Sequence, residues 1–426
     1  MDSAEVRISP GEVEATVTPP IAADLAVALV CHNNVETPVA VIRAAEQALA
    51  RSFPGEAGVL LVADVGSTAR TAAALRSAVT DPTRLVLFPL PADAVPTGAI
   101  VPVPGASAIR LLFESAAGFG VKALAVIDPD LAAPEPEAIA GLLAPILESG
   151  ADFVAPYYAR PRFAGAITTS IVYPFTRALY GLRLRFPAGG DFGCSTKFTR
   201  FCVAQGSWGG DDSRITADLW LVHRALTGGF RLSQAVLGPR AHTGTDGKTE
   251  LSGVLTQVLG VLFTEAERNV PFWQKVRSSA VVPLIGTPAG ADQEGLPLDL
   301  KRTVGAFRFG LENLMPVWKT VLPPSTLLEL MKLARRSEGD FRLPDALWAR
   351  IVYDFAIAFH RRMMSLDHLL SAVTPLYFGW LATHVAEMAG ADYAGSERRV
   401  EELCLRFESE KPYLISRWRW PDRFSP

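Results

Sequence analysis

The sequence has little that would suit a disulfide-bonded or a nucleic-acid-binding protein. It contains only 4 cysteines in 426 residues, and none lies in a C-x-x-C pair. Their wide separation disfavours both a structural zinc site and a secreted disulfide framework. Basic residues are not in excess, since 41 Lys and Arg stand against 44 Asp and Glu for a net charge of -3. Without a basic stripe to follow a phosphate backbone, nucleic acid is not expected as a partner.

The N-terminus also lacks the features of a secretion signal. Residues 1–23 are acidic and contain proline, where a signal peptide has a basic patch followed by an apolar stretch. We therefore expect a loose N-terminal arm over residues 1–23. A cytoplasmic location agrees with this arm and with the sparse cysteines.

A long uninterrupted apolar run is missing as well. The longest segment nearly without charge, residues 368–388, contains Pro375 and several hydroxyl side chains. This composition favours a buried helix over a transmembrane segment. Attachment to a membrane surface stays open, because Tyr377 and Trp380 are residue types that suit the lipid–water interface.

What the chain does have is apolar residues, which make up 49% of it and exceed the needs of one ordinary core. From residue 25, short apolar runs alternate with segments of helical period, which is typical of a layered α/β domain with a mostly parallel, covered sheet. The expected strands are 25–31, 58–64, 84–90, 123–128 and 152–158. Further helices are expected over residues 168–181, 215–229 and 251–269, with a strand at 231–238 between the last two.

The remaining sequence changes character after residue 277. Residues 278–298 are rich in Pro, Gly and Ala, which indicates a linker. Residues 299–426 have a helical pattern and predict an all-α C-terminal extension, which would also offer a surface for homo-oligomer formation. We thus expect an arm (1–23), an α/β domain (24–277), a linker (278–298) and a helical extension (299–426).

Three expected strands end in polar residues. His32 and Asn33 follow the first strand, Asp64 ends the second, and Asp128 and Asp130 follow the run "ALAVI". Because the carboxyl ends of parallel strands line one crevice where ligands bind, these polar clusters should converge. Two carboxylates there suit Mg²⁺ or Mn²⁺, which takes one or two carboxylates plus phosphate oxygens. The alternative is a strand-ending turn with solvated aspartates.

Several motifs in order resemble a family of bacterial nucleotide-sugar glycosyltransferases with the GT-A fold, related to glucosyl-phosphoglycerate, glucosylglycerate and mannosylglycerate synthases. The matching segments are "VALVCHNNVET", "VADVGST", "AVIDPDL", "VAPYYARPRFAGAITTSIVYPFTRALYG", "PAGGDFGCS", "ADLWLVHRAL", "GGFRLSQAVLGPRAH" and "LTQVLGVLF". The helical part, with "YDFAIAFH" and "TPLYFGW", also resembles the family's C-terminal region.

The resemblance implies a donor side and a metal site. Asp64 would receive the base and ribose of a UDP- or GDP-hexose, with His32, Asn33, Ser107 and Asp128 also binding the donor. Asp128, Asp130 and His242 would bind Mg²⁺ or Mn²⁺. The simpler alternatives are that Asp64 caps a helix beside Ser67, and that His242 is an ordinary surface or core histidine.

The resemblance also implies an acceptor side for a small acid such as glycerate or phosphoglycerate. Arg160, Arg162 and Thr168 would bind this acceptor, and the two arginines suit its carboxylate or phosphate. Asp191 in "GGDFG" has a permissive backbone that would let it approach sugar hydroxyls. Asp218 resembles the family's acidic residue near the acceptor, and both are candidate catalytic residues. Alternatively, "GGDFG" is a plain glycine-rich turn, and Asp218 pairs with Arg214 on the same helical face. Transfer with retention of anomeric configuration is implied.

The sequence also departs from the family pattern. Gly105 stands where relatives usually carry a lysine for the donor phosphates, and Pro161, Ala164 and Thr169 replace a histidine, an aspartate and an asparagine in the acceptor loop. Two alternative hypotheses of function therefore stand beside the glycosyltransferase hypothesis. One is a catalytically weakened relative that serves as a binding or assembly subunit. The other is transfer to a lipid phosphate, which would require membrane contact near Tyr377 and Trp380.

Overall fold

The computed structural model describes residues 23–32, 36–66, 69–90, 106–129, 135–160, 163, 165–206, 208, 214–239, 251–288 and 299–419. Apart from its last residue, the arm expected over residues 1–23 lies outside this part of the chain.

The described chain forms two compact units. The first is drawn from Met1–Ala159, Ala188–Lys248 and Val282–Pro288, and the second from Arg160–Pro187, Thr249–Val281 and Ala289–Pro426. These units differ from the expected domains, because Arg160–Pro187 and Thr249–Val281 group with the helical region instead of the α/β region. Neither unit is therefore a single continuous stretch of sequence.

The first unit is built on one twisted sheet. Among the described residues it has the strand order β10-β8-β5-β7-β4-β1-β2-β3. Every neighbouring pair is parallel except the two that involve β7, which runs antiparallel to β4 and β5. The bounds are β1 Leu25–His32, β2 Gly58–Val65, β3 Leu85–Leu90, β4 Ala123–Ile127, β5 Phe153–Ala159, β7 Phe192–Ser195, β8 Leu232–Pro239 and β10 Leu284–Ile285.

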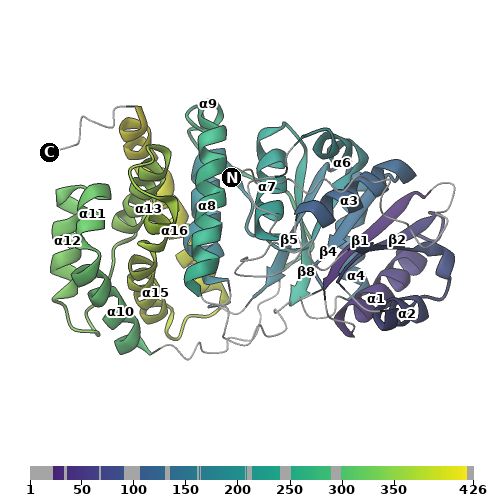
Figure 1. Ribbon diagram of the computed structural model, residues 1–426, viewed down its shortest axis with the longest axis horizontal. Coiled ribbons are helices and arrows are strands. Elements are labelled where there is room, and N and C mark those ends of the chain that lie inside the picture. The colour runs from purple at the N-terminus through teal and green to yellow at the C-terminus, as the bar shows by residue number, and fades with distance from the viewer. Residues whose placement is uncertain are drawn as a thin grey trace. The chain divides into compact units, whose positions relative to one another are not determined.

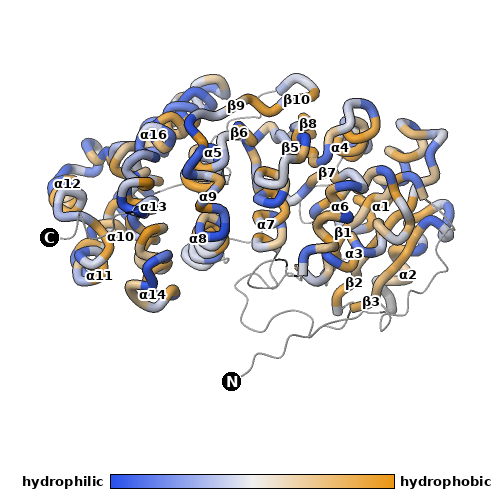
Figure 2. Tube along the Cα trace, turned by 90° about the horizontal axis from the view of Figure 1, so that it is seen from above, coloured by the Kyte–Doolittle hydropathy of each residue, from blue (hydrophilic) through white to orange (hydrophobic). Residues whose placement is uncertain are grey.

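Helices cover both faces of this sheet. Helices α1 (Glu36–Ser52), α2 (Ala69–Ala78) and α4 (Pro136–Ser149) lie on one face, and α3 (Ala106–Phe119), α6 (Thr196–Val203) and α7 (Arg214–Thr227) on the other (Figure 1). A 3₁₀ turn, Pro82–Arg84, precedes β3. Because both faces are covered, β1, β2 and β4 are apolar on both sides, and Figure 2 shows the central strands mostly in the hydrophobic colour.

The second unit is almost entirely helical. A π-helix, Thr168–Val172, continues directly into α5, Tyr173–Tyr180, and two short strands pair in parallel, β6 Leu182–Arg183 with β9 Ala280–Val281. The other helices are α8 Leu251–Arg268, α9 Val270–Trp273, α10 Leu300–Asn313, α11 Met315–Val321, α12 Pro324–Ala334, α13 Asp345–His360, α14 Leu366–Ser371, α15 Thr374–Met388 and α16 Tyr393–Arg419. Helix α13 is buried nearly all round, so it forms the centre of this unit.

The expected fold class is confirmed by this architecture. It is a Rossmann-like α/β fold with a mostly parallel sheet, accompanied by an all-α C-terminal region. The expected linker, residues 278–298, instead contributes two strands among its described residues. One of them, β10, is the edge strand of the large sheet beside β8.

One apolar helical stretch of the second unit is long enough to cross a membrane. It comprises α14 and α15 together, Leu366–Met388, and its most apolar window has a mean hydropathy of 1.2, but 72% of that window is buried within the protein. Tyr377 and Trp380 are fully buried and stack against each other. The buried helix expected here is confirmed, and these two side chains do not provide a membrane-facing surface.

Candidate functional site

The carboxyl ends of β1, β2 and β4 lie beside one another in the first unit. Strand β1 has β2 on one side and β4 on the other, so the strand order reverses between β1 and β4. Ligands of open α/β sheets bind outside such a switch point. His32 ends β1, Asp64 pairs in register with the residue before it, and Asp128 directly follows β4. Strand pairing thus brings these three predicted residues to one edge of the sheet.

Asp64 and His32 are oriented by contacts between β1 and β2. The Cys31 thiol donates to Asp64 Oδ1 over 3.4 Å, and both side chains are buried. Burial, together with the negative charge of Asp64, raises the pKa of the Cys31 thiol, which keeps it protonated as a donor. His32 Nδ1 lies 3.1 Å from the carbonyl oxygen of Val65. Because a carbonyl only accepts, Nδ1 carries a proton and donates to it.

Asp191 connects the ends of three strands. Its side chain is only 1% exposed. Its Oδ1 accepts the main-chain N–H of Asp128 over 2.8 Å, and its Oδ2 lies 3.0 Å from the Tyr158 hydroxyl. The same hydroxyl lies 2.8 Å from the carbonyl oxygen of Gly189. The start of β7 therefore fixes the backbone at the point where Asp128 leaves β4.

The two glycines before Asp191 leave space for neighbouring groups. Gly190 has a φ of +84°, and a Cβ built there would lie 2.6 Å from Asp128 Oδ2. A Cβ on Gly189 would lie 2.2 Å from Cγ of Pro156. The "GGDFG" turn thus has the permissive backbone expected for it, and the space it leaves is used by the carboxylate of Asp128. This carboxylate is a hard oxygen donor of the kind that Mg²⁺ and Mn²⁺ prefer.

Two other predicted residues lie on helices of the same unit. Ser107 is in the first turn of α3, where main-chain N–H groups favour an anion. Asp218 is buried on α7, which packs against α3 and α6. The Arg214 side chain, its alternative ion-pair partner, lies outside the described part of the chain.

The described acceptor residues belong to the second unit. Arg160 and Thr168 are both close to Gly165, where a built Cβ would lie 3.0 Å from an Arg160 guanidinium nitrogen and 3.9 Å from Thr168 Cβ. Thr168 opens the π-helix, and the Arg160 guanidinium lies over the ring of Phe186 at 5.2 Å from its centroid. Arg160 and Thr168, eight residues apart in sequence, thus lie near each other. π-Helical turns are frequent at functional sites.

Four predicted site residues lie outside the described residues, namely Asn33, Asp130, Arg162 and His242. The same holds for the departures at Gly105, Pro161 and Ala164. Within the described residues, no group of three or more His, Cys, Asp or Glu side chains is arranged to hold a metal ion. Asp128 is the predicted metal ligand that falls within them.

Sequence reasoning missed the roles of Tyr158 and Cys31. Tyr158 stands near the end of β5, and its buried hydroxyl holds the "GGDFG" turn. The sequence could have indicated this role of Tyr158, because the hydroxyl of a tyrosine inside a buried strand needs a hydrogen-bond partner. Cys31 precedes His32 in the expected crevice, but its pairing with Asp64 depends on the β1–β2 register.

The sequence matches no protein-family model and no curated protein. Among solved structures it is similar to glucosyl-3-phosphoglycerate synthase from Mycobacterium tuberculosis in complex with Mn²⁺, UDP and phosphoglyceric acid, at 21% identity over 58% of this chain and 78% of that chain, with a TM-score of 0.41. The complex of that enzyme with Mg²⁺ and UDP gives 21% identity, 58% and 79% coverage and a TM-score of 0.42. A structure described as a mycobacterial protein gives 21% identity, 58% and 74% coverage and a TM-score of 0.42.

Proposed function

We propose that this protein is a metal-dependent glycosyltransferase. It transfers a hexose from a nucleotide-diphosphate sugar to a small acid of the glycerate or phosphoglycerate type, with retention of configuration. The observation that carries the proposal is the Asp128 carboxylate, which lies at the switch point of the sheet in the space left by Gly190, on a backbone held by Asp191. The order of the sequence motifs around it supports the same function.

On the donor side, Asp64, His32, Asn33 and Ser107 bind the nucleotide, together with Asp128. Asp128, Asp130 and His242 hold Mg²⁺ or Mn²⁺, and the donor set fits because a carboxylate plus diphosphate oxygens suits a hard cation. When bound, the cation neutralises the charge of the nucleoside diphosphate. Asp64 keeps its place because the protonated Cys31 thiol donates to it.

On the acceptor side, Arg160 and Arg162 bind the carboxylate or phosphate of the small acid, and Thr168 contacts the acceptor. Asp218 orients the sugar or the acceptor. Asp191 acts through Asp128, because its carboxylate accepts the Asp128 N–H. Asp191 also approaches the sugar hydroxyls, which the permissive backbone of the glycine-rich turn allows.

One sequence feature favours a second candidate, a binding or assembly subunit with little catalysis. Gly105 occupies the place of the expected donor-phosphate lysine. Without the lysine, the protein would bind the diphosphate more weakly, and the metal ion would have to neutralise more of the diphosphate charge. In this second candidate, the helical region would form a homo-oligomer. Measurements of nucleotide binding and turnover distinguish it from the glycosyltransferase.

Calorimetric titration of UDP and of GDP, each with and without Mn²⁺, tests the donor site. We expect one nucleotide to bind in a Mn²⁺-dependent manner, and Asp128→Asn to weaken that binding at least about ten-fold, since it removes a charged ligand. Glu148→Gln, which neutralises an exposed carboxylate on α4 of the same unit, is the matched control. If neither nucleotide binds the unmodified protein, the glycosyltransferase proposal fails and the binding-subunit alternative gains.

Turnover is measured with UDP-glucose, 3-phosphoglycerate and Mn²⁺. We expect a glucosylated acceptor, and the anomeric configuration of the product, read by NMR, tests retention. Nucleotide binding without transfer to any small acid would favour the binding subunit.

A further inference from the structure

Helix α16 presents a charged face to the segment that carries the acceptor residues. Glu397, Glu401, Cys404, Glu408 and Lys411 recur every three or four residues, so they share one side of the helix. This side lies against α5, where Tyr173 packs with Val400 and Cys404. Arg177, Arg183 and Arg185 of this segment therefore have carboxylate partners in α16.

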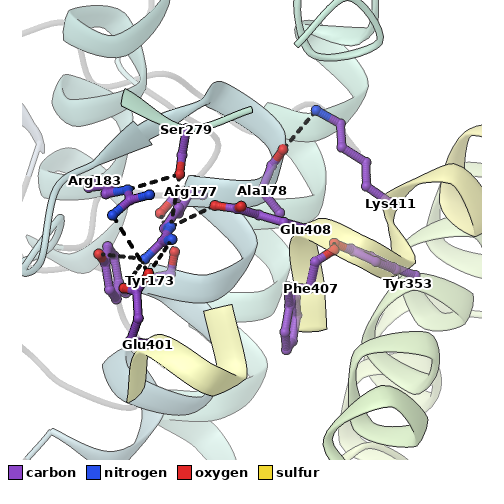
Figure 3. A network of polar contacts seen from close by, with 11 residues as sticks. Tyr173, Arg177, Ala178, Arg183, Ser279, Tyr353, Glu401, Phe407, Glu408 and Lys411 are labelled. Carbon is purple, nitrogen blue, oxygen red and sulfur yellow. Dashed lines mark hydrogen bonds and ion pairs between the residues drawn. The ribbon is translucent and has the colours of Figure 1, made fainter. Parts of the chain in front are cut away.

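Arg177 is the most deeply buried of these contacts, with a side chain 0% exposed. Its two terminal nitrogens bond both carboxylate oxygens of Glu401, one of them over 2.8 Å, and its Nε lies 2.7 Å from Glu408 Oε1 (Figure 3). A buried guanidinium without its counter-charges is strongly unfavourable. The middle of α5 is thus committed to lie against α16.

A second connection reaches Arg160 itself. The Arg160 guanidinium lies 5.2 Å from the Phe186 ring centroid, and Arg185 lies over the same ring at 4.6 Å. Arg185 in turn forms an ion pair with Glu397 at 3.0 Å, through two nitrogens. A continuous series of contacts therefore runs from the acceptor residue Arg160 to α16.

Lys411 ties down the C-terminal end of α5. Its buried ammonium donates to the carbonyl oxygen of Ala178 over 2.7 Å (Figure 3). It also donates to the carbonyl oxygens of Leu179 over 3.3 Å and Val276 over 3.0 Å. The last carbonyls of a helix carry partial negative charge, which a cation stabilises. Lys411 thus fixes the end of α5 and the turn after α9 together.

These constraints reach Thr168 through one continuous helical run. The π-helix that begins at Thr168 passes without a break into α5, and Gly181, which caps the C-terminus of α5, is in the left-handed conformation. On another side, the Trp348 indole N–H of α13 donates to the Ser170 carbonyl oxygen over 3.0 Å. A shift of α5 would therefore move Thr168 with it.

We propose that α16 positions the acceptor side of the site. Arg177 and Arg185 are the positioning residues: Arg177 links α16 to Thr168, and Arg185 links α16 to Arg160. Calling this segment the acceptor side rests on the proposed function. The hold of α16 on residues 160–187 rests on the contacts alone.

Hydrogen exchange tests the hold directly in the full-length protein. In Glu397→Gln and in the double variant Glu401→Gln/Glu408→Gln, we expect main-chain amides of residues 166–181 to exchange at least about ten-fold faster, because charged hydrogen bonds are lost. The control is Glu410→Gln, on the same helix, which removes the partner of Arg350 instead. Arg185→Lys, which keeps the charge but loses the paired geometry, should give an intermediate effect. Equal exchange in all variants would overturn the proposal.

Binding measurements test whether α16 positions the residues that bind the acceptor. The two glutamate variants should weaken binding of 3-phosphoglycerate, in the presence of UDP and Mn²⁺, by about ten-fold, while the Kd of UDP with Mn²⁺ stays within about two-fold. A parallel loss of both affinities would indicate general damage and overturn the positioning role, as would unchanged 3-phosphoglycerate binding with faster exchange. A wild-type protein that binds neither compound would overturn the proposed function, while the exchange result would still decide the role of α16.

Discussion

Gly190 sets how closely the Asp128 carboxylate can approach the main chain. Its φ of +84° disfavours any side chain, and an added Cβ would lie 2.6 Å from Asp128 Oδ2. Gly190→Ala should therefore displace the carboxylate and weaken Mn²⁺-dependent nucleotide binding by about ten-fold or more, at a stability cost of about 1–3 kcal/mol. Calorimetry and urea denaturation measure the two effects separately.

The control for this prediction is Gly55→Ala. A Cβ at Gly55 meets nothing within 4 Å, and its φ is not in the left-handed region. Nucleotide affinity should stay unchanged there. Normal affinity in Gly190→Ala would mean that the carboxylate does not need its observed position.

Asp354 gives the folded protein a defined pH response. Its buried carboxylate accepts the Tyr413 hydroxyl over 2.7 Å and pairs with Arg417 at 3.2 Å. Burial raises its pKa from 3.8 to about 7, against the opposing effect of Arg417. The folded state thus holds the proton more tightly than the unfolded state between about pH 4 and 7, and the free energy of unfolding should fall by up to about 1.4 kcal/mol per pH unit as pH rises through this window.

Asp354→Asn should remove this contribution, leaving a flatter profile between about pH 4 and 7. Urea denaturation at several pH values measures it, and Asp367→Asn, an exposed carboxylate of α14 in the same unit, is the control. A slope that survives in Asp354→Asn would assign the pH dependence to other groups.

At the scale of elements, the packing of α4 on β7 depends on one glycine. A Cβ at Gly193 in β7 would lie 2.2 Å from the carbonyl oxygen of Leu142 in α4, a main-chain atom that cannot turn aside. Gly193→Ala should therefore destabilise the protein by about 3 kcal/mol or more. The midpoint of urea denaturation measures the loss.

A matched change in α4 should have the opposite sign. A Cβ at Gly141 would make ordinary contacts, at 3.6 Å from Leu237 and 3.9 Å from Ala235. Alanine favours a helix over glycine by about 1 kcal/mol, so Gly141→Ala should be neutral or stabilising. Equal losses in Gly141→Ala and Gly193→Ala would contradict the close approach at β7.

The strands that the sequence predicts well are those buried on both faces. Strands β1, β2 and β4 are continuous apolar runs ended by polar residues, so their bounds agree with the expected ones to within one residue. The sequence predicts only a glycine-rich turn at the start of β7, because four residues are too few to show the alternation of a strand. Strand β7 forms because it pairs with β4 on one side and β5 on the other. Strand β10 lies in a Pro-rich stretch and exists through pairing with β8.

The candidate site divides in the same way. Polar residues at strand ends predict the neighbourhood of His32, Asp64 and Asp128, because parallel strands share one edge. The hydrogen bond by which Asp191 holds the Asp128 main chain cannot be predicted from local sequence, since the two residues are 63 positions apart. Likewise, the partners of Arg177 lie 224 and 231 residues further on, which is why residues 160–187 were expected in the α/β domain.

At the scale of the whole molecule, neither unit can be isolated by one cut. The second unit takes α5 from Arg160–Pro187 and α8 from Thr249–Val281, and Phe175 of α5 packs against Phe263 of α8 and Tyr353 of α13. A fragment of residues 299–426 should therefore lack native tertiary structure and expose the apolar surface of α13. Near-ultraviolet circular dichroism of the fragment and of the full chain measures this.

The complementary fragment, residues 1–298, carries α5 without α16 and leaves the buried Arg177 without Glu401 and Glu408. It should aggregate or bind a hydrophobic dye. A well-ordered monomer from either fragment would show that the helical unit does not need its early segments.

The distance along the chain between Arg177 and Glu401 also has a consequence for synthesis. The ribosome must add 224 residues after Arg177 before Glu401 has been synthesised. At about 5–20 residues per second this takes roughly ten to forty-five seconds. During that interval strands β1 to β8 of the large sheet can already pair, while Arg177 in α5 lacks its carboxylate partners. Folding of the helical unit should therefore wait until α16 has been synthesised, and a chain that stops before α16 should be a target for chaperones or proteases.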